Sequence, residues 1–260
     1  MWLQGYYLPY WSFPLFVLAG MLVSFINSIA GGGGLVSFTT MIFFGLPASL
    51  ANGTNRLGVL LGSASSTYTF QKQGHFNWAL SLKAAIPAAF GSIVGAWLAV
   101  KLPDKLFNPI LAVIIVAVVL ATIKHQAQKP KSSELTEPYL ASTPLALLAY
   151  TLVGFYGGFL QIGIGFVIMY TFSRLGRLSI FQINALKTAT TFLYSLTSIS
   201  LFAFSSKIHW PIAISLAIGN VFGGIFGSHW QVKKGEAWVN RFLMVMGFIV
   251  ASKLSWDTFK

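Results

Sequence analysis

Two basic residues lie inside long apolar stretches of the sequence: Arg56 in ANGTNRLG and Lys187 in INALKTAT. A charge in hydrocarbon is costly, so an ionisable residue at such a position is a functional hypothesis by default. The alternative is that each long side chain extends its charged end to a membrane interface. An uncharged hydrogen-bond donor, Asn52 or Asn184, stands near each of them. We therefore predict that both cations, with the two amides, face a central cavity and attract a small anion.

The second feature that could bind a ligand is a run of four glycines, Gly31, Gly32, Gly33 and Gly34. Each glycine costs a helix about 1 kcal/mol relative to alanine, whereas close packing needs small residues on one face only. The run therefore indicates a break in a helix. Such a break exposes backbone N–H groups and a helix N-terminus, which together can bind an anion. Discontinuous helices of transporters present their ends to anionic substrates in this way.

A weaker glycine cluster, GGFLQIGIG, spans residues 157–165 in the second half of the chain. We expect Gly163 in this cluster to belong to the site, with Gln161 as the polar group beside it. In the first half, Asn27 and Ser28 stand just before the glycine run and supply polar groups of the same kind.

Other glycines have a simpler explanation. Gly91 and Gly95, like Gly223 and Gly227, are four residues apart and fall on one face of a helix. Small residues at this spacing allow two helices in a membrane to approach closely. We assign both pairs to helix packing.

Acidic residues are few, and all five fall in expected loops or at segment ends: Asp104, Glu134, Glu137, Glu236 and Asp257. Transport of protons or cations commonly uses carboxylates inside the membrane, and this sequence offers none there. The chain has no cysteine, and its four histidines show no metal-ligand spacing. We therefore expect no metal, no cofactor and no enzymatic activity.

The composition requires lipid as the main solvent of the chain. Hydrophobic residues make up 55% of it and charged residues 8%, with a mean hydropathy of +0.72. A soluble domain carries about 25% charged residues. The formal net charge is +12, but the basic residues are scattered between apolar runs rather than gathered on one soluble face, which argues against a nucleic-acid partner. Lys83 is one of these, and we expect it to reach toward an interface.

The elements that must position the candidate residues are membrane helices, since each crossing needs about 20 apolar residues and backbone groups in lipid must be satisfied within the segment. The predicted fold class is all-α, with about eight segments. Their approximate ranges are 12–44, 50–71, 77–101, 105–124, 143–173, 180–204, 209–232 and 237–256. The first and fifth are too long for one straight crossing, and glycines interrupt both.

An internal repeat organises these segments. A shift of 132 residues aligns 31–101 with 163–233 without a gap. Identities across it pair Gly31 with Gly163, Asn52 with Asn184, Ser63 with Ser195, Ser66 with Ser198 and Trp78 with Trp210. The predicted organisation is a first membrane repeat at 1–124, a hydrophilic linker at 125–142 and a second repeat at 143–260. Whether the repeats are parallel or inverted stays open, as do the orientation of the termini and the oligomeric state. Such duplication is typical of transporters that bind substrate between their repeats.

The motifs FINSIAGGGGLVSF, GLPASLANGTNRLG and QKQGHFNW, with INALKTAT and FSSKIHW as a second copy, resemble those of the TauE/SafE family of sulfite exporters. The resemblance covers 12–256, and it implies a permease for sulfite or organosulfonates. Its motif positions in this chain are the glycine run 31–34, then Thr54, Asn55 and Arg56, and in the second copy Asn184 and Lys187. The second glycine cluster is thinner than the first.

Residues and resemblance agree on a membrane transporter of a small anion, and the resemblance implies that the anion is a sulfur-containing oxyanion and that the direction is export. Asn amides, backbone N–H groups and one or two cations suit a compact oxyanion, and a negative-inside potential favours the exit of an anion. The expected partners are this small anion and the lipid bilayer, and the expected location is the bacterial cytoplasmic (inner) membrane. An anion channel or a uniporter for another small anion is the alternative.

Overall fold

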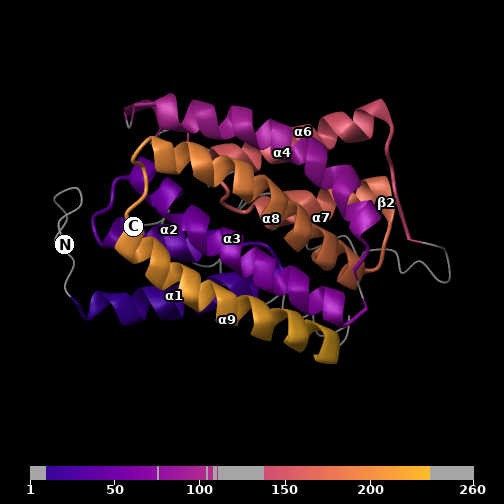
Figure 1. Ribbon diagram of the computed structural model, residues 1–260, viewed down its shortest axis with the longest axis horizontal. Helices are drawn as coiled ribbons and strands as arrows, with labels where there is room; N and C mark the ends of the chain where they lie inside the picture. Colours follow the sequence, from indigo (N-terminus) through magenta and orange to yellow (C-terminus); the bar gives the residue numbers. More distant parts are fainter. Residues whose placement is uncertain (1–9, 75, 104, 108–109, 111–137, 235–260) are drawn as a thin grey trace, which may run out of the picture.

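The computed structural model describes residues 10–74, 76–103, 105–107, 110 and 138–234. Within them the chain is mostly helical (Figure 1). The first half contains α1 (Ser12–Ile29), α2 (Gly34–Phe43), α3 (Ala48–Lys72) and α4 (Trp78–Lys101). The second half contains α6 (Pro144–Phe159), α7 (Ile164–Leu175), α8 (Ile180–Phe204) and α9 (Trp210–Lys234). These helices coincide with the predicted segments to within a few residues.

Two predicted segments cannot be compared in the same way. Segment 105–124 is described only at 105–107 and 110, and segment 237–256 lies outside the described residues. Most of the predicted linker also lies outside them. At its end the structure differs from an all-α expectation, because β1 (Tyr139–Leu140) pairs antiparallel with β2 (Gly176–Arg177). Leu140 is buried, so this part of the chain packs against the helices rather than standing in solvent.

The helix break expected at the glycine run is present. α1 ends at Ile29, α2 begins at Gly34, and Gly31 has a φ of 124°, which favours glycine. α1 and α2 form a hairpin, here called the first hairpin, since the Phe16 ring near its start lies 5.1 Å from the Phe44 ring at its end. Both ends of the long segment 12–44 therefore lie at the same end of the molecule.

The second hairpin consists of α6 and α7, which break at residues 160–163. Its open end is closed by the pairing of β1 with β2, and the backbone N–H of Ala141 donates to the carbonyl of Leu175 at 2.9 Å. Gln161 and Gly163 at the turn have φ values of 63° and 67°. A non-glycine residue in this region is uncommon and costs free energy, and such residues gather at functional sites.

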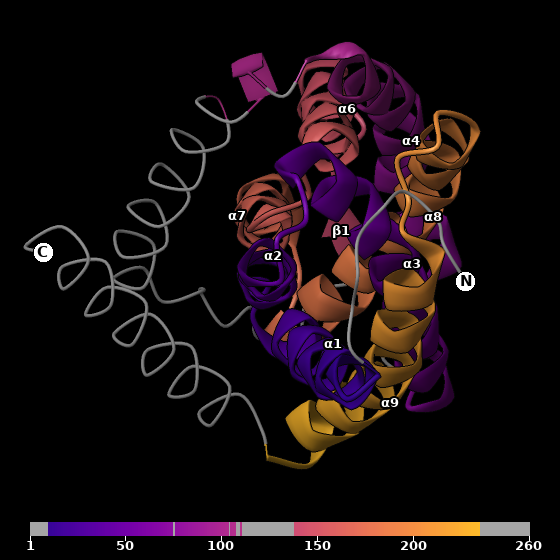
Figure 2. The same ribbon diagram turned by 90° about the vertical axis from the view of Figure 1, so that its left-hand side faces the viewer.

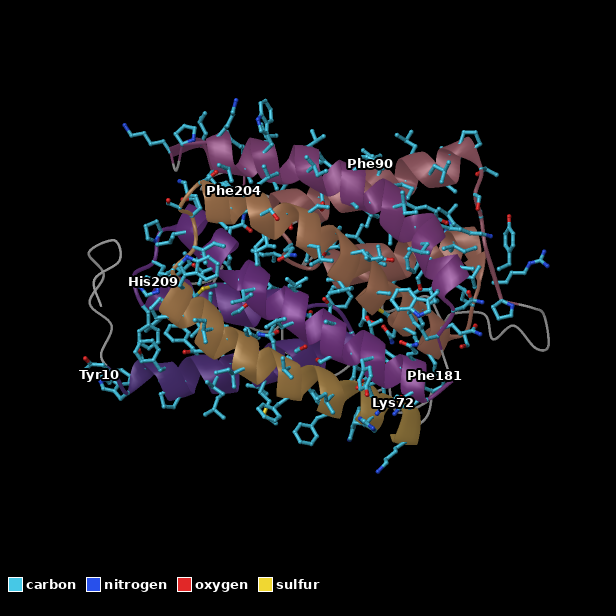
Figure 3. The ribbon with its side chains drawn as sticks, viewed as in Figure 1. Tyr10, Lys72, Phe90, Phe181, Phe204 and His209 are labelled. Carbon is cyan, nitrogen blue, oxygen red and sulfur yellow. The ribbon has the colours of Figure 1, made fainter. Side chains whose placement is uncertain are left out.

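The long helices run in opposite directions in the two halves. In Figure 3, Tyr10 before α1, Phe204 at the end of α8 and His209 before α9 lie at one end of the molecule. Lys72 at the end of α3 and Phe181 near the start of α8 lie at the other end. α3 and α8 are therefore antiparallel.

Each hairpin packs mainly on a helix of the other half. α1 packs along α9, and α6 packs along α4 (Figure 2). The glycine pairs assigned to packing lie at these contacts. A Cβ on Gly91 or Gly95 would collide with α6 backbone, and one on Gly223 or Gly227 with α1 backbone. This confirms their assignment.

Three of the described helices are long and apolar enough to cross a membrane: α1, α4 and Trp210–Gln231 of α9. α3 and α8, at 25 residues each, are long enough but carry more polar residues. The reason lies in their position. They contact one another and the helices around them, so their buried polar side chains meet protein rather than lipid.

Candidate functional site

The tips of the two hairpins meet inside the protein. Gly31 and Gly165 are in direct contact, and a Cβ on Gly165 would collide with the Cα of Gly31. Next to this contact lies a buried cavity of about 40 Å³, room for about three water molecules. We call it the central cavity. Residues from both halves line it: Ser24, Asn27, Ser28, Gly31, Gly34, Val59, Ser63, Ser66, Gln161, Ile164, Gly165, Lys187, Thr188, Thr191 and Asn220.

Two helix N-termini open onto the central cavity, because Gly34 begins α2 and Ile164 begins α7. The first N–H groups of a helix have no partner within it and carry the positive end of its dipole. Two such ends at one cavity favour a negative charge there. Several of these N–H groups are already used. That of Gly33 donates to Asn27 Oδ1 at 2.9 Å, those of Leu35 and Val36 donate to the carbonyls of Gly32 and Gly33, and that of Phe166 donates to the carbonyl of Gly163.

Lys187 supplies the one charged side chain among the residues that line the central cavity. It is 2% exposed, and its ammonium donates to Asn184 Oδ1 at 2.5 Å and weakly to Met169 Sδ at 3.7 Å. An ammonium has three N–H donors, so one remains. All five carboxylates of the chain belong to residues outside the described ranges, so none balances this charge in the described part of the chain.

Arg56 is equally buried but lies elsewhere. Its guanidinium donates to the carbonyls of Gly157 at 3.0 Å and Gly158 at 2.5 Å, near the end of α6. It also lies over the ring of Phe202, 4.3 Å from the centroid. Arg56 does not line the central cavity. The expected convergence of Arg56 and Lys187 on one cavity is therefore not found.

Asn52 and Asn184, which the internal repeat pairs, each donate to the last carbonyl of a helix in the other half. Asn52 Nδ2 donates to the carbonyl of Phe159, the last residue of α6, at 2.8 Å. Asn184 Nδ2 donates to the carbonyl of Ile29, the last residue of α1, at 3.2 Å. The last carbonyls of a helix lack partners within it, and both hairpins need such a donor where they break. Neither asparagine is among the residues that line the central cavity; both hold the helix ends of the hairpins in place.

The remaining predicted residues divide in the same way. Gly31, Gly34 and Gln161 line the central cavity, whereas Gly32, Gly33 and Gly163 do not. Thr54 accepts a hydrogen bond from the backbone N–H of His209 at 2.9 Å, and so caps the start of α9. Asn55 is buried without lining the cavity. Lys83 is exposed, with its ammonium 6.0 Å from the Tyr139 ring centroid.

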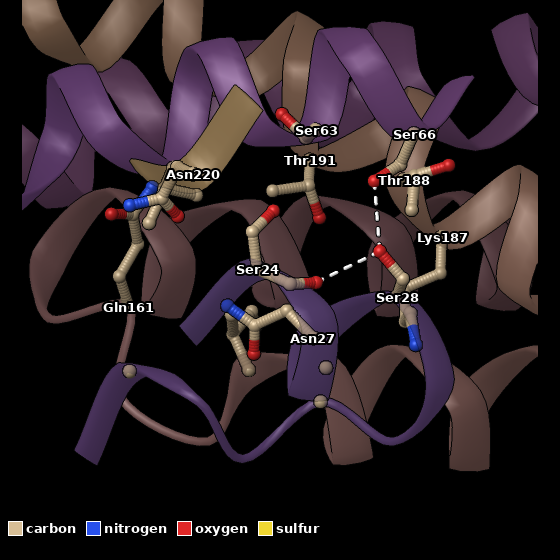
Figure 4. A pocket seen from close by; sticks show the side chains of 15 residues that line it. Ser24, Asn27, Ser28, Ser63, Ser66, Gln161, Lys187, Thr188, Thr191 and Asn220 are labelled. Atoms are coloured by element: carbon tan, nitrogen blue, oxygen red, sulfur yellow. Dashed lines mark hydrogen bonds between the residues drawn. The ribbon is translucent and has the colours of Figure 1, made fainter. Parts of the chain in front are cut away.

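Several lining residues were not singled out as site residues from the sequence. The hydroxyl-bearing ones are Ser24, Ser63, Ser66, Thr188 and Thr191, and Asn220 adds an amide (Figure 4). Ser63 and Ser66 belong to the repeat identities, which was a usable signal. So was Asn220, because a lone amide inside an apolar segment has the same rarity as a lone charge.

A buried polar cavity between two broken helices, open to helix N-termini, is the arrangement that membrane transporters use to hold substrates. The chain belongs to the TauE/SafE family: the family described as sulfite exporter TauE/SafE matches residues 16–254. A probable membrane transporter protein of Sinorhizobium sp is 29% identical over 94% of this chain and 92% of its own length.

Two further relatives bear the same description. A probable membrane transporter protein of Haemophilus influenzae is 26% identical, over 92% of each chain. One of Escherichia coli strain K12 is 27% identical over 94% of this chain and 89% of its own. No solved structure matches the chain. Family, relatives and apolar helices together indicate a membrane transporter.

Proposed function

We propose that the chain exports a small sulfur-containing oxyanion, sulfite or an organosulfonate, and binds it in the central cavity. The observation that carries this proposal is the charge pattern there. The N-termini of α2 and α7 and the ammonium of Lys187 meet at one cavity, and none of the described lining residues is acidic. A site with such a balance attracts anions and repels cations.

The direction follows from the membrane potential. A negative interior favours the exit of an anion by about 2.3 kcal/mol per charge for each 100 mV. Export therefore needs no proton relay, which agrees with the lack of carboxylates in the predicted segments. The relatives named above come from bacteria, which supports a location in the bacterial cytoplasmic membrane.

The proposed architecture is two homologous, inverted repeats with about eight segments in all. Its support is the exchange of contacts, in which α1 packs along α9 and α6 along α4, and the antiparallel course of α3 and α8. An outward apolar stripe also recurs at positions 132 residues apart. It comprises Leu82, Ile86, Phe90 and Val94 on α4 and Ile214, Ile218, Phe222 and Phe226 on α9, all exposed.

In this proposal the site residues have two roles. Lys187, Gln161, Gly31 and Gly34 contact the anion. Arg56, Asn52, Asn184, Asn55, Thr54, Gly32, Gly33 and Gly163 form the frame that holds the hairpin tips and helix ends. A frame of this kind keeps the first group in position without touching the substrate.

Flux from liposomes that contain the purified protein tests the proposal. Sulfite efflux should saturate with concentration and show counterflow, as expected of a carrier that binds its substrate. Linear conductance without saturation would favour the channel alternative. Efflux of sulfite and organosulfonates no faster than from empty liposomes would overturn the proposal.

A further inference from the structure

Two residues that line the central cavity have a side-chain oxygen without a hydrogen-bond donor among the described residues. Asn220 Oδ1 and Gln161 Oε1 lack a partner among the described residues, and their side chains are 1% and 3% exposed. Both residues line the cavity. A buried acceptor that lost its water is costly until it meets a donor. The occupant of the cavity is therefore expected to bring one.

The orientation of Asn220 is fixed by its own helix. Its Nδ2 donates to the carbonyl of Leu216 at 2.7 Å, and turning the amide would set two acceptor oxygens against one another. The Nε2 of Gln161 likewise donates to Ser195 Oγ at 3.0 Å. In each amide, one N–H therefore donates to the protein, and the oxygen has no donor among the described residues.

The hydroxyl groups beside them strengthen this bias. Thr188 donates to the carbonyl of Ala185 at 2.9 Å, along its own helix. The Ser28 hydroxyl lies 2.8 Å from the carbonyl of Ser24 and 2.8 Å from the Ser66 hydroxyl, which in turn lies 2.9 Å from the carbonyl of Gly62. One of these two serines donates to the other, so no more than one proton of the pair can be given elsewhere. Hydroxyls that spend their proton on the backbone have only lone pairs left for a ligand. The cavity wall is consequently rich in acceptors.

The charged side chain lies at a different place. In Figure 4, Lys187 stands on one side of the cavity, and Gln161 and Asn220 stand on the other. A single ammonium balances a single negative charge. A bare dianion would leave both amide oxygens without a donor, and only the helix N-termini would remain to balance its second charge.

We infer that the transported species is a monoanion with its own O–H or N–H donor, held with its anionic oxygens toward Lys187 and its donor toward Asn220 and Gln161. This inference rests on the proposed function and narrows its substrate class. The donor can belong to the oxyanion itself, as in hydrogensulfite. It can also belong to a short tail, as in a hydroxyl- or amino-substituted sulfonate.

Two matched pairs of competitors test the inference and distinguish these sources. At mildly acidic pH, methylphosphonate and methanesulfonate are both monoanions of the same shape, and only the first has an O–H on its head. Ethanesulfonate and 2-hydroxyethanesulfonate differ by one O–H on the tail. Each compound is titrated against sulfite efflux from liposomes. In at least one pair, the donor-bearing member should inhibit at a concentration at least about tenfold lower, since a site built around a hydrogen bond rejects the analogue without it.

Asn220→Leu supplies the second readout, because it keeps the approximate volume and removes the acceptor. It should bring the inhibition ratio of the discriminating pair close to one. Gln161→Met, which likewise removes an acceptor, serves the same purpose should Asn220→Leu not fold. Equal inhibition within both pairs by the wild-type protein, with sulfite efflux intact, overturns this inference and leaves the proposed function standing. A ratio that Asn220→Leu and Gln161→Met both leave unchanged overturns it as well. Absence of sulfite efflux, by contrast, overturns the proposed function.

Discussion

Arg56 and Lys187 carry the same charge and are both buried, but their hydrogen-bond partners indicate different roles. The terminal nitrogens of Arg56 are used on the carbonyls of Gly157 and Gly158, a geometry that suits a planar guanidinium with fixed donors. Lys187 has an amide and a thioether as partners and keeps a donor for the central cavity. We therefore separate the two residues in their expected effects.

Lys187→Met should abolish sulfite efflux while the protein reaches the membrane at normal abundance. The substitution removes a buried charge without a carboxylate partner in the described structure, so folding loses little and can gain. The measurement is efflux per amount of protein in liposomes. Lys83→Met is the control, because Lys83 is exposed, and it should behave like the wild type. Normal efflux by Lys187→Met would remove Lys187 from the site.

Arg56→Met should instead lower stability. It leaves two buried carbonyls without their charged donor, and bonds of this kind contribute about 1.5–3 kcal/mol each. We expect a loss of about 3 kcal/mol in the free energy of unfolding, read as a lower melting temperature in detergent. Arg56→Lys should recover only part of the lost stability, because an ammonium cannot match both carbonyls in the way a planar guanidinium does. A variant Arg56→Met that melts normally but fails to transport would return Arg56 to the substrate.

The sequence could identify both cations as exceptional but could not divide their roles. A charge in an apolar segment is visible in any window of the chain, whereas the partner of Arg56 is not. Gly157 lies 101 residues away from it, and only packing of the two halves brings the carbonyl to the guanidinium. The same holds for Asn52, whose partner Phe159 lies 107 residues away.

At the scale of elements, the meeting of the two hairpin tips determines where the central cavity lies. Gly165 leaves no room for a Cβ beside Gly31. Two glycines from different halves thus allow two backbones to touch, and the N-termini of α2 and α7 reach one cavity because of that contact.

Gly165→Ala should therefore force the tips apart and reduce both efflux and melting temperature. Overpacking of a tight contact costs about 1–3 kcal/mol. Gly45→Asn is the matched control, since Gly45 has a φ of 84° with nothing near its missing Cβ, and asparagine tolerates this backbone region. Efflux is measured in liposomes and melting in detergent. Wild-type values for Gly165→Ala would contradict the close contact of the tips.

The breaks themselves could be predicted, because four glycines in a row exceed what packing needs. Which of the four would face the cavity could not. Gly31 and Gly34 line it, while Gly33 packs under Val23 and donates its N–H to Asn27. This division depends on how the chain turns between α1 and α2, and four identical residues carry no signal for the shape of a turn.

At the scale of the whole molecule, the proposed inverted repeats fix which loops share a side of the membrane. Tyr10 and the loop at Ser205 lie at one end, and Ser142 before α6 lies with β1 and β2 at the other (Figures 1 and 3). The duplication could be predicted from the sequence, but not whether the repeats are parallel or inverted, because an alignment records similarity and not direction in space.

Single cysteines test this arrangement without background, since the natural chain has none. Tyr10→Cys and Ser205→Cys should react with a membrane-impermeant maleimide from one side of the membrane, and Ser142→Cys from the other. All three positions are exposed. Labelling is compared between intact cells and inside-out vesicles. Reaction of all three from the same side would rule out the inverted arrangement.

The exchange of partners between halves also constrains biosynthesis. α1 leaves the ribosome early, but the donor to its last carbonyl, Asn184, and the helix it packs along, α9, are made much later. Asn52 Nδ2 and Arg56 likewise lack their carbonyl acceptors until α6 has been made. The first half therefore enters the bilayer with polar groups that only later segments can satisfy. We therefore expect the first half to complete its packing only after α6, α8 and α9 have been made, rather than to fold as an independent domain.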